Sequence, residues 1–511
     1  MTESRSKKFF YNTLFTALLQ VINVIATFIV PKFMLRYYGS EINGLVTSIT
    51  QFITYFNLVE AGLSNAAVYS LYKPLAENDA DRVSSIVSAS KKFYIHAGYL
   101  FTGLTVLLAI VYPLYIDIEG FSPYLVALLV IVLGSNGFLE FFTLAKYRVL
   151  LTADQKTYVI SIASILHMII QTSVIAILSY FQINIVIVRT IAVLSIILRS
   201  VVLASYCKLR YRKVNFNAQP DMKALDKRWD AMFLQILGAI HQGTTVILLT
   251  IIVKDLALVS VYSVFNIVIS GLNNVLSIFN SGLAASFGEV IAKDQKQILQ
   301  KAYKEFEYGF YMVITFVYAV SFIMIMPFVT LYTSGVTDAN YNMPLVGFMI
   351  VLNGYLYHLK TPQGMLVISA GMYKETKWRT LTQGVIAFVG GAILAFPFGI
   401  YGILLAAILS NLYRDIDLWL FGNKYITELS PMSSIKNVGK SLMGLILIVL
   451  PFWFIDFTAS SWLAWIGIAC AVSVYAIVIV LIITLIFDRK TLVGILRRLK
   501  NIFKRDRHVR P

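Results

Sequence analysis

Charged residues are scarce in this sequence. Asp, Glu, Lys and Arg make up 14% of its 511 residues, whereas soluble domains carry about 25%. So few charges cannot cover a water-exposed surface, which excludes a soluble globular protein. Hydrophobic residues make up 58% and gather in runs of about 20 or more, long enough to cross a hydrocarbon core of roughly 30 Å. The sequence therefore predicts an all-α polytopic membrane protein.

Motifs that would carry chemistry are also missing. The two cysteines, Cys207 and Cys470, are far apart and fit neither a disulfide framework nor a metal site. The sequence contains no Walker A motif, no metal-ligand cluster and no acidic catalytic pair in a predicted outer loop. These absences argue against ATP hydrolysis. We therefore expect a protein that is not an enzyme and that has no cofactor and no metal site.

The hydrophobic runs predict about fourteen transmembrane helices. The first run follows Arg5, Lys7 and Lys8 as in a signal peptide. It is too long and lacks a small-residue cleavage site, so we expect an uncleaved helix. The expected spans are residues 10–35, 43–70, 93–115, 122–145, 158–180, 183–206, 231–253, 258–286, 308–333, 343–368, 380–398, 400–422, 441–456 and 462–487.

The net charge of +17 comes from basic residues that are distributed unevenly. Most Lys and Arg residues lie in alternate connecting segments, and few lie in the connections between them. This is the positive-inside pattern, which predicts that both termini are cytoplasmic. It also explains the positive charge without a nucleic-acid partner. The basic segments are residues 1–9, 71–92, 146–157, 207–230, 287–307, 369–379, 423–440 and 488–511.

Two halves of the sequence repeat each other. Leu58-Val-Glu-Ala-Gly has a second copy near Ser281-Gly-Leu-Ala-Ala, and Leu150-Leu-Thr-Ala-Asp-Gln-Lys-Thr resembles Val367-Ile-Ser-Ala-Gly-Met-Tyr-Lys-Glu-Thr. The copies lie about 220 residues apart, and duplicated membrane halves of this kind form two lobes around a substrate path. Because each half contains an even number of spans, we expect parallel six-helix lobes and a transporter.

The repeat sets the predicted domain organisation. The two additional spans lie outside the repeat, and we expect a peripheral position for them rather than a role in the path. In the C-terminal tail, basic residues alternate with apolar ones, as in a helix that lies on anionic membrane lipids; ordinary topology anchoring explains this pattern equally well. The predicted parts are the N-lobe (1–206), a basic cytoplasmic linker (207–230), the C-lobe (231–423), two additional spans (424–487) and a basic cytoplasmic tail (488–511).

Cations in or beside the spans are the candidate substrate-binding residues. Ionisable groups in a membrane helix usually face a cavity or a partner, and a guanidinium suits phosphate because its planar fork donates two parallel hydrogen bonds. Snorkelling to headgroups or a structural ion pair is the alternative for each, and Arg414 can pair with Asp417 at i+3. The proposed cationic cavity consists of Arg36, Arg189, Arg199, Lys360 and Arg414.

Acids and histidines within the spans are candidates for ion coupling or charge balance. A carboxylate there could bind H⁺ or Na⁺, or it could neutralise a nearby arginine, which is the commoner role. We assign Asp415 and Asp417 to Arg414, which leaves a modest excess of cations and favours an anionic cargo. The candidates are Glu60, Glu140, His241, His358 and Asp417.

Three residues are candidate hinges. Glycine and proline allow membrane helices to bend when neighbours satisfy the freed backbone groups. They are also simply common in membrane helices. The candidates are Gly62, Gly282 and Pro362.

Four motifs resemble those of a known family. Tyr38-Gly-Ser-Glu-Ile-Asn-Gly-Leu-Val and Phe56-Asn-Leu-Val-Glu-Ala-Gly-Leu-Ser resemble the opening of bacterial polysaccharide flippases. Tyr147-Arg-Val-Leu-Leu-Thr-Ala-Asp-Gln-Lys-Thr-Tyr and Ala370-Gly-Met-Tyr-Lys-Glu-Thr-Lys are similar to their capsule and exopolysaccharide branch. These flippases belong to the multidrug/oligosaccharidyl-lipid/polysaccharide exporter superfamily, and the resemblance covers about residues 1–430.

The resemblance implies a fold and a function. Members of the superfamily, which includes the MATE transporters, have two six-helix lobes in a V, and some carry two extra helices. A polysaccharide flippase moves undecaprenyl-pyrophosphate-linked repeat units to the outer leaflet of the bacterial cytoplasmic membrane by alternating access. Three sources of directionality stay open: an H⁺ or Na⁺ gradient, the membrane potential, and consumption of the product by a polysaccharide polymerase. This polymerase and its chain-length machinery are the expected partners. The family's aspartate-leucine-glycine turn is Glu60-Ala-Gly here, which leaves an ion-coupling role for this carboxylate open.

Two other cargoes fit the same superfamily. A lipid II flippase shares the fold and the fourteen spans, so the sequence separates it poorly from a polysaccharide flippase. A MATE-type drug antiporter coupled to a cation is expected to have a cavity dominated by acids and aromatic residues, which the cations here disfavour.

Overall fold

The computed structural model describes residues 5–60, 63–118, 120–222, 243–453, 455 and 457–489. Over these ranges the regular elements are helices, and the only β pairing is an isolated bridge between Ile118 and Phe121. The predicted all-α polytopic membrane protein is confirmed. The labelled helices are α1 (Arg5–Phe56), α2 (Leu63–Glu77), α3 (Ala80–Tyr115), α4 (Pro123–Leu139), α5 (Ala145–Ala153), α6 (Thr157–Tyr180), α7 (Ile185–Val193), α8 (Ser195–Arg210), α10 (Leu256–Ala292), α11 (Lys296–Tyr332), α12 (Pro344–Leu359), α13 (Thr361–Ser369), α14 (Tyr373–Val385), α15 (Gly391–Gly422), α16 (Pro431–Val449) and α17 (Trp462–Phe487).

Ten helices of the described residues are long and apolar enough to cross a membrane. Two of them are too long for one crossing, and each contains a glycine with non-helical backbone angles, Gly39 and Gly399. The expected tenth span is divided into α12 and α13, each too short to be counted alone. The expected seventh span is described only from Gly243 onwards, as a short apolar helix. These features account for the difference between the ten long apolar helices of the described residues and the roughly fourteen spans expected from the sequence.

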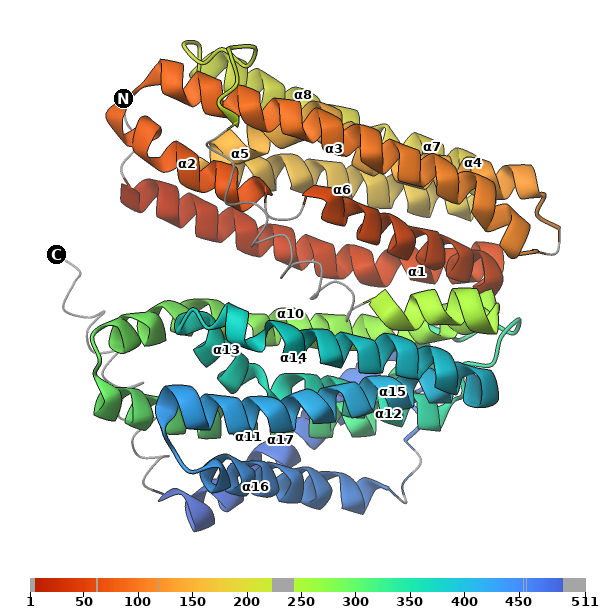
Figure 1. Ribbon diagram of the computed structural model, residues 1–511. Coiled ribbons are helices and arrows are strands. Elements are labelled where there is room, and N and C mark those ends of the chain that lie inside the picture. The colour runs from red at the N-terminus through yellow and green to blue at the C-terminus, as the bar shows by residue number, and fades with distance from the viewer. Residues whose placement is uncertain are drawn as a thin grey trace. The chain divides into compact units, whose positions relative to one another are not determined.

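Helix α1 reverses direction at Gly39. Near the start of the helix, Lys8 contacts Asp154. Tyr38 lies about one membrane thickness further along the helix axis, and its hydroxyl donates to the carbonyl of Ile183. The chain then returns, and a short 3₁₀ turn ends at Glu60, which contacts Arg148 on the side of Asp154 again. Figure 1 shows the two arms of α1 running back along each other.

The turn at Gly39 is held by a carboxylate. Gly39 has φ 83° and ψ 175°, a combination that is essentially restricted to glycine. The backbone N–H of the next residue, Ser40, donates to Oδ2 of Asp338 at 2.6 Å, and its hydroxyl donates to Oδ1 at 2.7 Å. The acidic group therefore caps the N-terminus of the returning arm, where the helix dipole favours a negative charge.

Replacing Gly39 with alanine is expected to lower the free energy of unfolding by about 1–3 kcal/mol. A Cβ at this position would lie 2.6 Å from Oδ2 of Asp338, and the backbone angles are unfavourable for any side chain. Thermal unfolding of the detergent-solubilised variant measures the effect. Gly103→Ala is the matched control, because a Cβ there meets nothing within 4 Å and the residue is inside helix α3. Equal unfolding temperatures for the two variants would contradict this account of the turn.

The chain forms two compact units. The first comprises residues 1–263 with 335–339, and the second comprises 264–334 with 340–511. The first unit contains the helices of the predicted N-lobe together with the short apolar helix Gly243–Val253 and the start of α10. The predicted division into lobes at the linker 207–230 describes a sequence repeat, and it stays a prediction.

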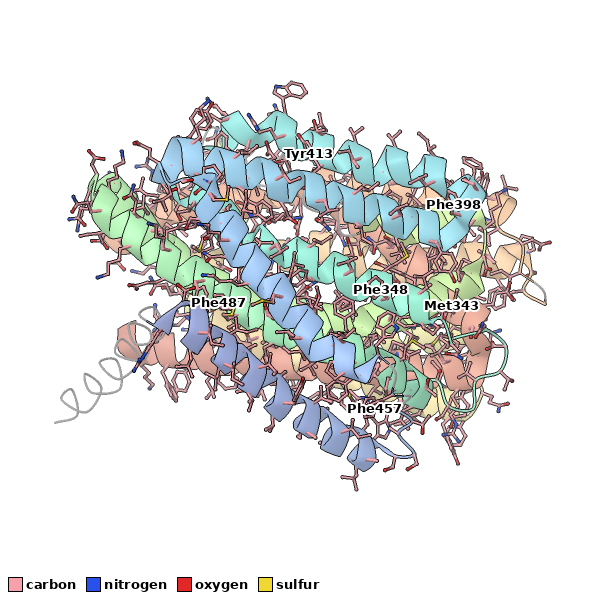
Figure 2. All side chains as sticks on the ribbon, turned by 90° about the horizontal axis from the view of Figure 1, so that it is seen from below. Met343, Phe348, Phe398, Tyr413, Phe457 and Phe487 are labelled. Atoms are coloured by element: carbon pink, nitrogen blue, oxygen red, sulfur yellow. The ribbon has the colours of Figure 1, made fainter. Side chains whose placement is uncertain are left out.

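In the second unit, α11 is the central packing element. It packs against α12, α16 and α17. The core between α11 and the two additional helices contains Ala319, Ile323, Ile448 and Val472. Figure 2 shows Met343, Phe398 and Phe457 toward one end of this unit and Phe487 toward the other, as expected for helices that alternate in direction.

A polar cluster joins the start of α1 to the connection between α5 and α6. The carboxylate of Asp154 accepts hydrogen bonds from Lys8 at 2.9 Å and from the Tyr211 hydroxyl at 2.6 Å, and it lies 2.7 Å from the Lys156 ammonium. Burial alone would raise the pKa of Asp154, but the hydrogen bonds from Lys156, Lys8 and Tyr211 outweigh it and hold this pKa below its usual value.

Some predicted features fall outside the described residues. These are Gly62, His241, most of the C-terminal tail (490–511) and the linker after residue 222. The side chains around Gly282 are likewise not described, although α10 runs through this position as helix.

Candidate functional site

In the first unit, Arg148 is the centre of a charge cluster. Its Nη2 donates to both carboxylate oxygens of Glu60 at 2.9 Å, and its Nη1 donates to Oε1 of Glu140 at 2.6 Å. All three side chains are about three-quarters buried. Glu140 begins a π-helical turn, Glu140–Leu144, between α4 and α5. Such turns are frequent at functional sites. Both predicted carboxylates therefore neutralise an arginine, which is the commoner of their two predicted roles.

Arg199 approaches the same cluster from α8. Its Nη1 lies 3.7 Å from Oε2 of Glu140. The Nε atom of Arg199 is buried and has no hydrogen-bond partner in the part of the chain that the structure describes. Nearby, the hydroxyl of Ser195 and Nδ1 of His167 share a 2.7 Å hydrogen bond. Arg199 is thus only weakly neutralised and retains donor capacity.

Arg189 lines a cavity of about 270 Å³ in the first unit. Its side chain is 9% exposed, and among the described residues its Nε atom has no hydrogen-bond partner. The cavity wall also contains polar side chains that can contact a ligand. They are Thr50, Thr54, Asn57, Asn136, Glu140 and Gln171. A buried arginine that faces a polar cavity with an unused donor is suited to an anion.

Arg36 lies apart from this cavity. Its side chain is exposed, and the guanidinium is 5.7 Å from the ring centre of Tyr37. The structure therefore places Arg36 at the surface of the first arm of α1, just before the Gly39 turn. It does not contribute to the cavity wall that contains Arg189.

In the second unit, Lys360 lies at the break between α12 and α13. It is the C-cap residue of α12 and also the N-cap residue of α13. Its ammonium donates to Oδ1 of Asn411 and lies 4.8 Å from the ring centre of Tyr357. Nδ2 of Asn411 donates in turn to Oδ1 of Asn353 at 2.8 Å. The ammonium thus has a polar partner but no ion pair within the described ranges.

Pro362 occupies the first turn of α13, where its missing N–H leaves no hydrogen bond unmade. The candidate hinge is therefore placed at an actual break in the helix. His358, before the break, is buried, with Nε2 2.9 Å from Oδ1 of Asn273. It packs close to Phe310 and Tyr318 and lies on a different face from Lys360.

The expected pairing of Arg414 is half right. Its Nη1 donates to Oδ2 of Asp417 at 2.6 Å, and its Nη2 donates to the hydroxyl of Thr380 at 3.0 Å. Arg379 donates to the other oxygen of Asp417. Asp415 was wrongly assigned to Arg414, because adjacent helical residues point about 100° apart.

Asp415 instead faces Lys360. The Asp415 side chain is 1% exposed, and over the described ranges neither carboxylate oxygen has a hydrogen-bond partner. Lys360 is the cation with which it interacts electrostatically, and the two side chains form no ion pair over the described ranges. A buried carboxylate without hydrogen bonds is rare and requires an explanation. The ammonium provides one, because a nearby opposite charge favours the ionised form of a carboxyl group.

Sequence reasoning missed Arg148 and Arg379 because both lie in segments counted as cytoplasmic. Arg148 is in the motif Tyr147-Arg-Val-Leu, and its partners come from the 3₁₀ turn after α1 and the π-helical turn after α4. One usable signal was the pair of unmatched acids, Glu60 and Glu140, which required a nearby cation. No group of three or more His, Cys, Asp or Glu side chains that could hold a metal occurs among the described residues.

Comparisons with known proteins give structural but not sequence relatives. No protein-family model and no curated protein matches this sequence. The fold is similar to that of an inward-facing MATE family transporter of the MOP superfamily, with a TM-score of 0.67 and 13% identity over 79% of this chain and 95% of that one. It is also similar to the lipid II flippase MurJ in an inward closed conformation, with a TM-score of 0.64 and 16% identity over 94% of this chain and 100% of that one.

A third structure, MATE in a bent conformation, matches with a TM-score of 0.57 and 14% identity over 81% of this chain and 94% of that one. At these identities the comparisons show the fold. The chain is a multi-pass membrane protein with the fold of MOP-superfamily transporters, and the proteins that it resembles are transporters and a flippase rather than enzymes.

Proposed function

We infer that this protein flips a lipid-linked oligosaccharide, with an undecaprenyl-pyrophosphate carrier, from the inner to the outer leaflet of the bacterial cytoplasmic membrane. The repeat unit would serve capsule, exopolysaccharide or O-antigen synthesis. A polysaccharide polymerase would consume the product. In this proposal both termini lie in the cytoplasm, as the distribution of basic residues predicts.

The observation that carries the proposal is the buried guanidinium of Arg189. The Arg189 side chain lines a cavity whose wall contains amide and hydroxyl side chains, and its buried Nε donor has no hydrogen-bond partner among the described residues. Pyrophosphate offers oxygens that a guanidinium binds through two parallel hydrogen bonds, and amides and hydroxyls suit sugar hydroxyls. Glu140, the acid in the cavity wall, is already bound to Arg148, so the cavity keeps an excess of positive charge.

The comparison with the lipid II flippase also supports a lipid-linked cargo. The alignment with MurJ covers 94% of this chain. The part of the chain outside this alignment is shorter than α16 and α17 together, so the alignment includes at least part of these two additional helices. The alignment with the MATE transporter covers only 79%. A lipid II flippase is therefore the nearest alternative, since lipid II is itself a polyprenyl-pyrophosphate-linked sugar.

A cation-coupled drug antiporter is the second candidate. The acid Glu140 in the cavity wall and the TM-score of 0.67 to a multidrug transporter favour it. A cationic drug, however, would have to bind beside Arg189, which is buried and has no ion pair among the described residues. The unfavourable interaction between two like charges in a low-dielectric site argues against this cargo.

Flipping in proteoliposomes tests the proposal. The substrate is a synthetic undecaprenyl-pyrophosphate oligosaccharide, and the readout is its leaflet distribution over time. We expect Arg189→Gln to reduce the flipping rate about 10- to 100-fold, because a hydrogen bond to a charged group contributes about 1.5–3 kcal/mol. Arg189→Lys keeps the charge but loses the planar fork, so we expect an intermediate rate.

Arg82→Gln is the matched control, because Arg82 is exposed at the start of α3 and outside the cavity wall. A parallel assay with lipid II separates the two lipid-linked cargoes. If the wild type flips neither lipid but exchanges a cationic drug for H⁺ or Na⁺, the antiporter replaces the flippase. If it flips lipid and Arg189→Gln does so at the wild-type rate, Arg189 does not bind the pyrophosphate.

A further inference from the structure

The second unit contains a buried carboxylate that has no charged partner among the described residues. Glu307, in α11, is 1% exposed and forms no ion pair there. Its Oε1 accepts hydrogen bonds from Tyr303 at 2.8 Å and from Gln363 at 2.7 Å. All the side chains that donate hydrogen bonds to Glu307 are uncharged. They supply the N–H and O–H groups that an ionised carboxylate, which can only accept, requires.

The other donors to Glu307 come from the first additional helix, α16. The hydroxyl of Ser434 donates to Oε1 at 2.7 Å, and Nδ2 of Asn437 donates to Oε2 at 2.9 Å. These two residues lie on the buried face of α16. A second connection follows one turn later, where the hydroxyl of Ser441 shares a 2.7 Å hydrogen bond with that of Tyr355 in α12.

From Glu307 the hydrogen bonds continue to the break beside Lys360. Nε2 of Gln363 also contacts the hydroxyl of Tyr311 at 3.1 Å, and this hydroxyl donates to the carbonyl of Leu359 at 3.0 Å. Leu359 is the last residue of α12, and carbonyls at a helix end lack partners within the helix. Tyr311 therefore supplies a hydrogen bond at the point where the helix is interrupted.

We propose that Glu307 is a positioning residue through which α16 fixes the break between α12 and α13, and with it the direction of Lys360. The additional helices then act on substrate capture from a distance, without contacting the substrate. The link is physical and continuous: α16 to Glu307, Glu307 to Gln363, and Gln363 through Tyr311 to Leu359. The effect on transport rests on the proposed function, whereas the effect on the position of Lys360 does not.

The position of Lys360 can be measured without any substrate. In a background with Cys207→Ala and Cys470→Ala, Lys360→Cys is labelled with a small water-soluble maleimide, and the rate is compared with and without Glu307→Gln. We expect the rate to change at least about threefold, since mutations along such a network shift coupling by about 0.5–2 kcal/mol. The labelling rate of Lys424→Cys, an exposed position in the same unit, stays unchanged.

A second variant guards against misfolding of Glu307→Gln. Ser434→Ala with Asn437→Leu removes the donors from α16, together with the 3.2 Å hydrogen bond that Ser434 accepts from Nδ2 of Asn423. Ser433→Ala with Lys436→Leu alters the other face of the same turns as its matched control. In the flipping assay we expect the donor-removing pair to raise the half-saturating substrate concentration about tenfold, with a nearly unchanged maximal rate. A merely structural role would lower the maximal rate and the unfolding temperature instead.

The outcomes separate the two proposals. Altered labelling of Lys360→Cys supports the positioning role, even if the wild type flips no lipid-linked sugar and the proposed function fails. Unchanged labelling in both the Glu307→Gln and the Ser434→Ala/Asn437→Leu backgrounds overturns it, even if flipping by the wild type is demonstrated.

Discussion

Replacing Arg148 with alanine is expected to lower the free energy of unfolding substantially, because it breaks a partly buried charge cluster in the first unit. The variant leaves Glu60 and Glu140 without the guanidinium that they share at 2.6–2.9 Å. Removing one partner of a buried ion pair costs about 3–5 kcal/mol. Because these side chains are 24–28% exposed, solvent screening reduces the expected loss to about 2–3 kcal/mol. Thermal and denaturant unfolding in detergent measure it.

The reason for the expected loss can itself be tested. In Arg148→Gln combined with Glu60→Gln and Glu140→Gln, the arginine and both of its carboxylate partners are neutral. Only the longer contact of 3.7 Å between Arg199 and Glu140 is lost as well, so we expect stability to recover by more than half. Lys208→Ala is the control, because Lys208 is an exposed base near the end of α8. If Arg148→Ala unfolds at the same temperature as Lys208→Ala, the cluster does not stabilise the fold.

The helices and their turns were largely predictable from the sequence. Hydrophobic runs long enough to cross a membrane predict where the helices lie. The turns at Gly39 and Gly399 fall between expected spans. Of the candidate hinges, Pro362 lies at the break between α12 and α13, Gly282 lies within α10, and Gly62 lies outside the described residues. The turns at Gly39 and Gly399 use backbone angles that other residues rarely adopt.

Local charge pairing was predictable and distant pairing was not. Arg414 and Asp417 are three residues apart on one helix, so their contact follows from helical geometry. Arg148 and Glu60 are 88 residues apart, and nothing in their local sequence specifies the contact. Glu307 was overlooked because it ends a basic segment that was counted as cytoplasmic. Packing against α16 is what buries it.

Replacing Lys360 with alanine is expected to have the largest effect on transport. The ammonium donates a hydrogen bond to Asn411 and interacts electrostatically with Asp415, and it forms no ion pair among the described residues. In the proposed function, an anionic cargo would meet a cation that is already buried in protein and not paired with a carboxylate. We expect the flipping rate of the undecaprenyl-pyrophosphate oligosaccharide to fall about 100-fold. This corresponds to the loss of about 3 kcal/mol, the upper end of the range for a hydrogen bond to a charged group.

Loss of Lys360 also leaves Asp415 buried without a compensating cation, so Lys360→Ala is expected to destabilise the second unit. Adding Asp415→Asn removes that charge. The double variant should therefore recover its unfolding temperature, while flipping stays as low as in Lys360→Ala, because the Lys360 ammonium is still missing. Lys424→Ala, at an exposed base, is the control for both measurements. Recovery of flipping together with stability would mean that Lys360 serves only to balance Asp415, and the anion-binding role would then belong to Arg189 alone.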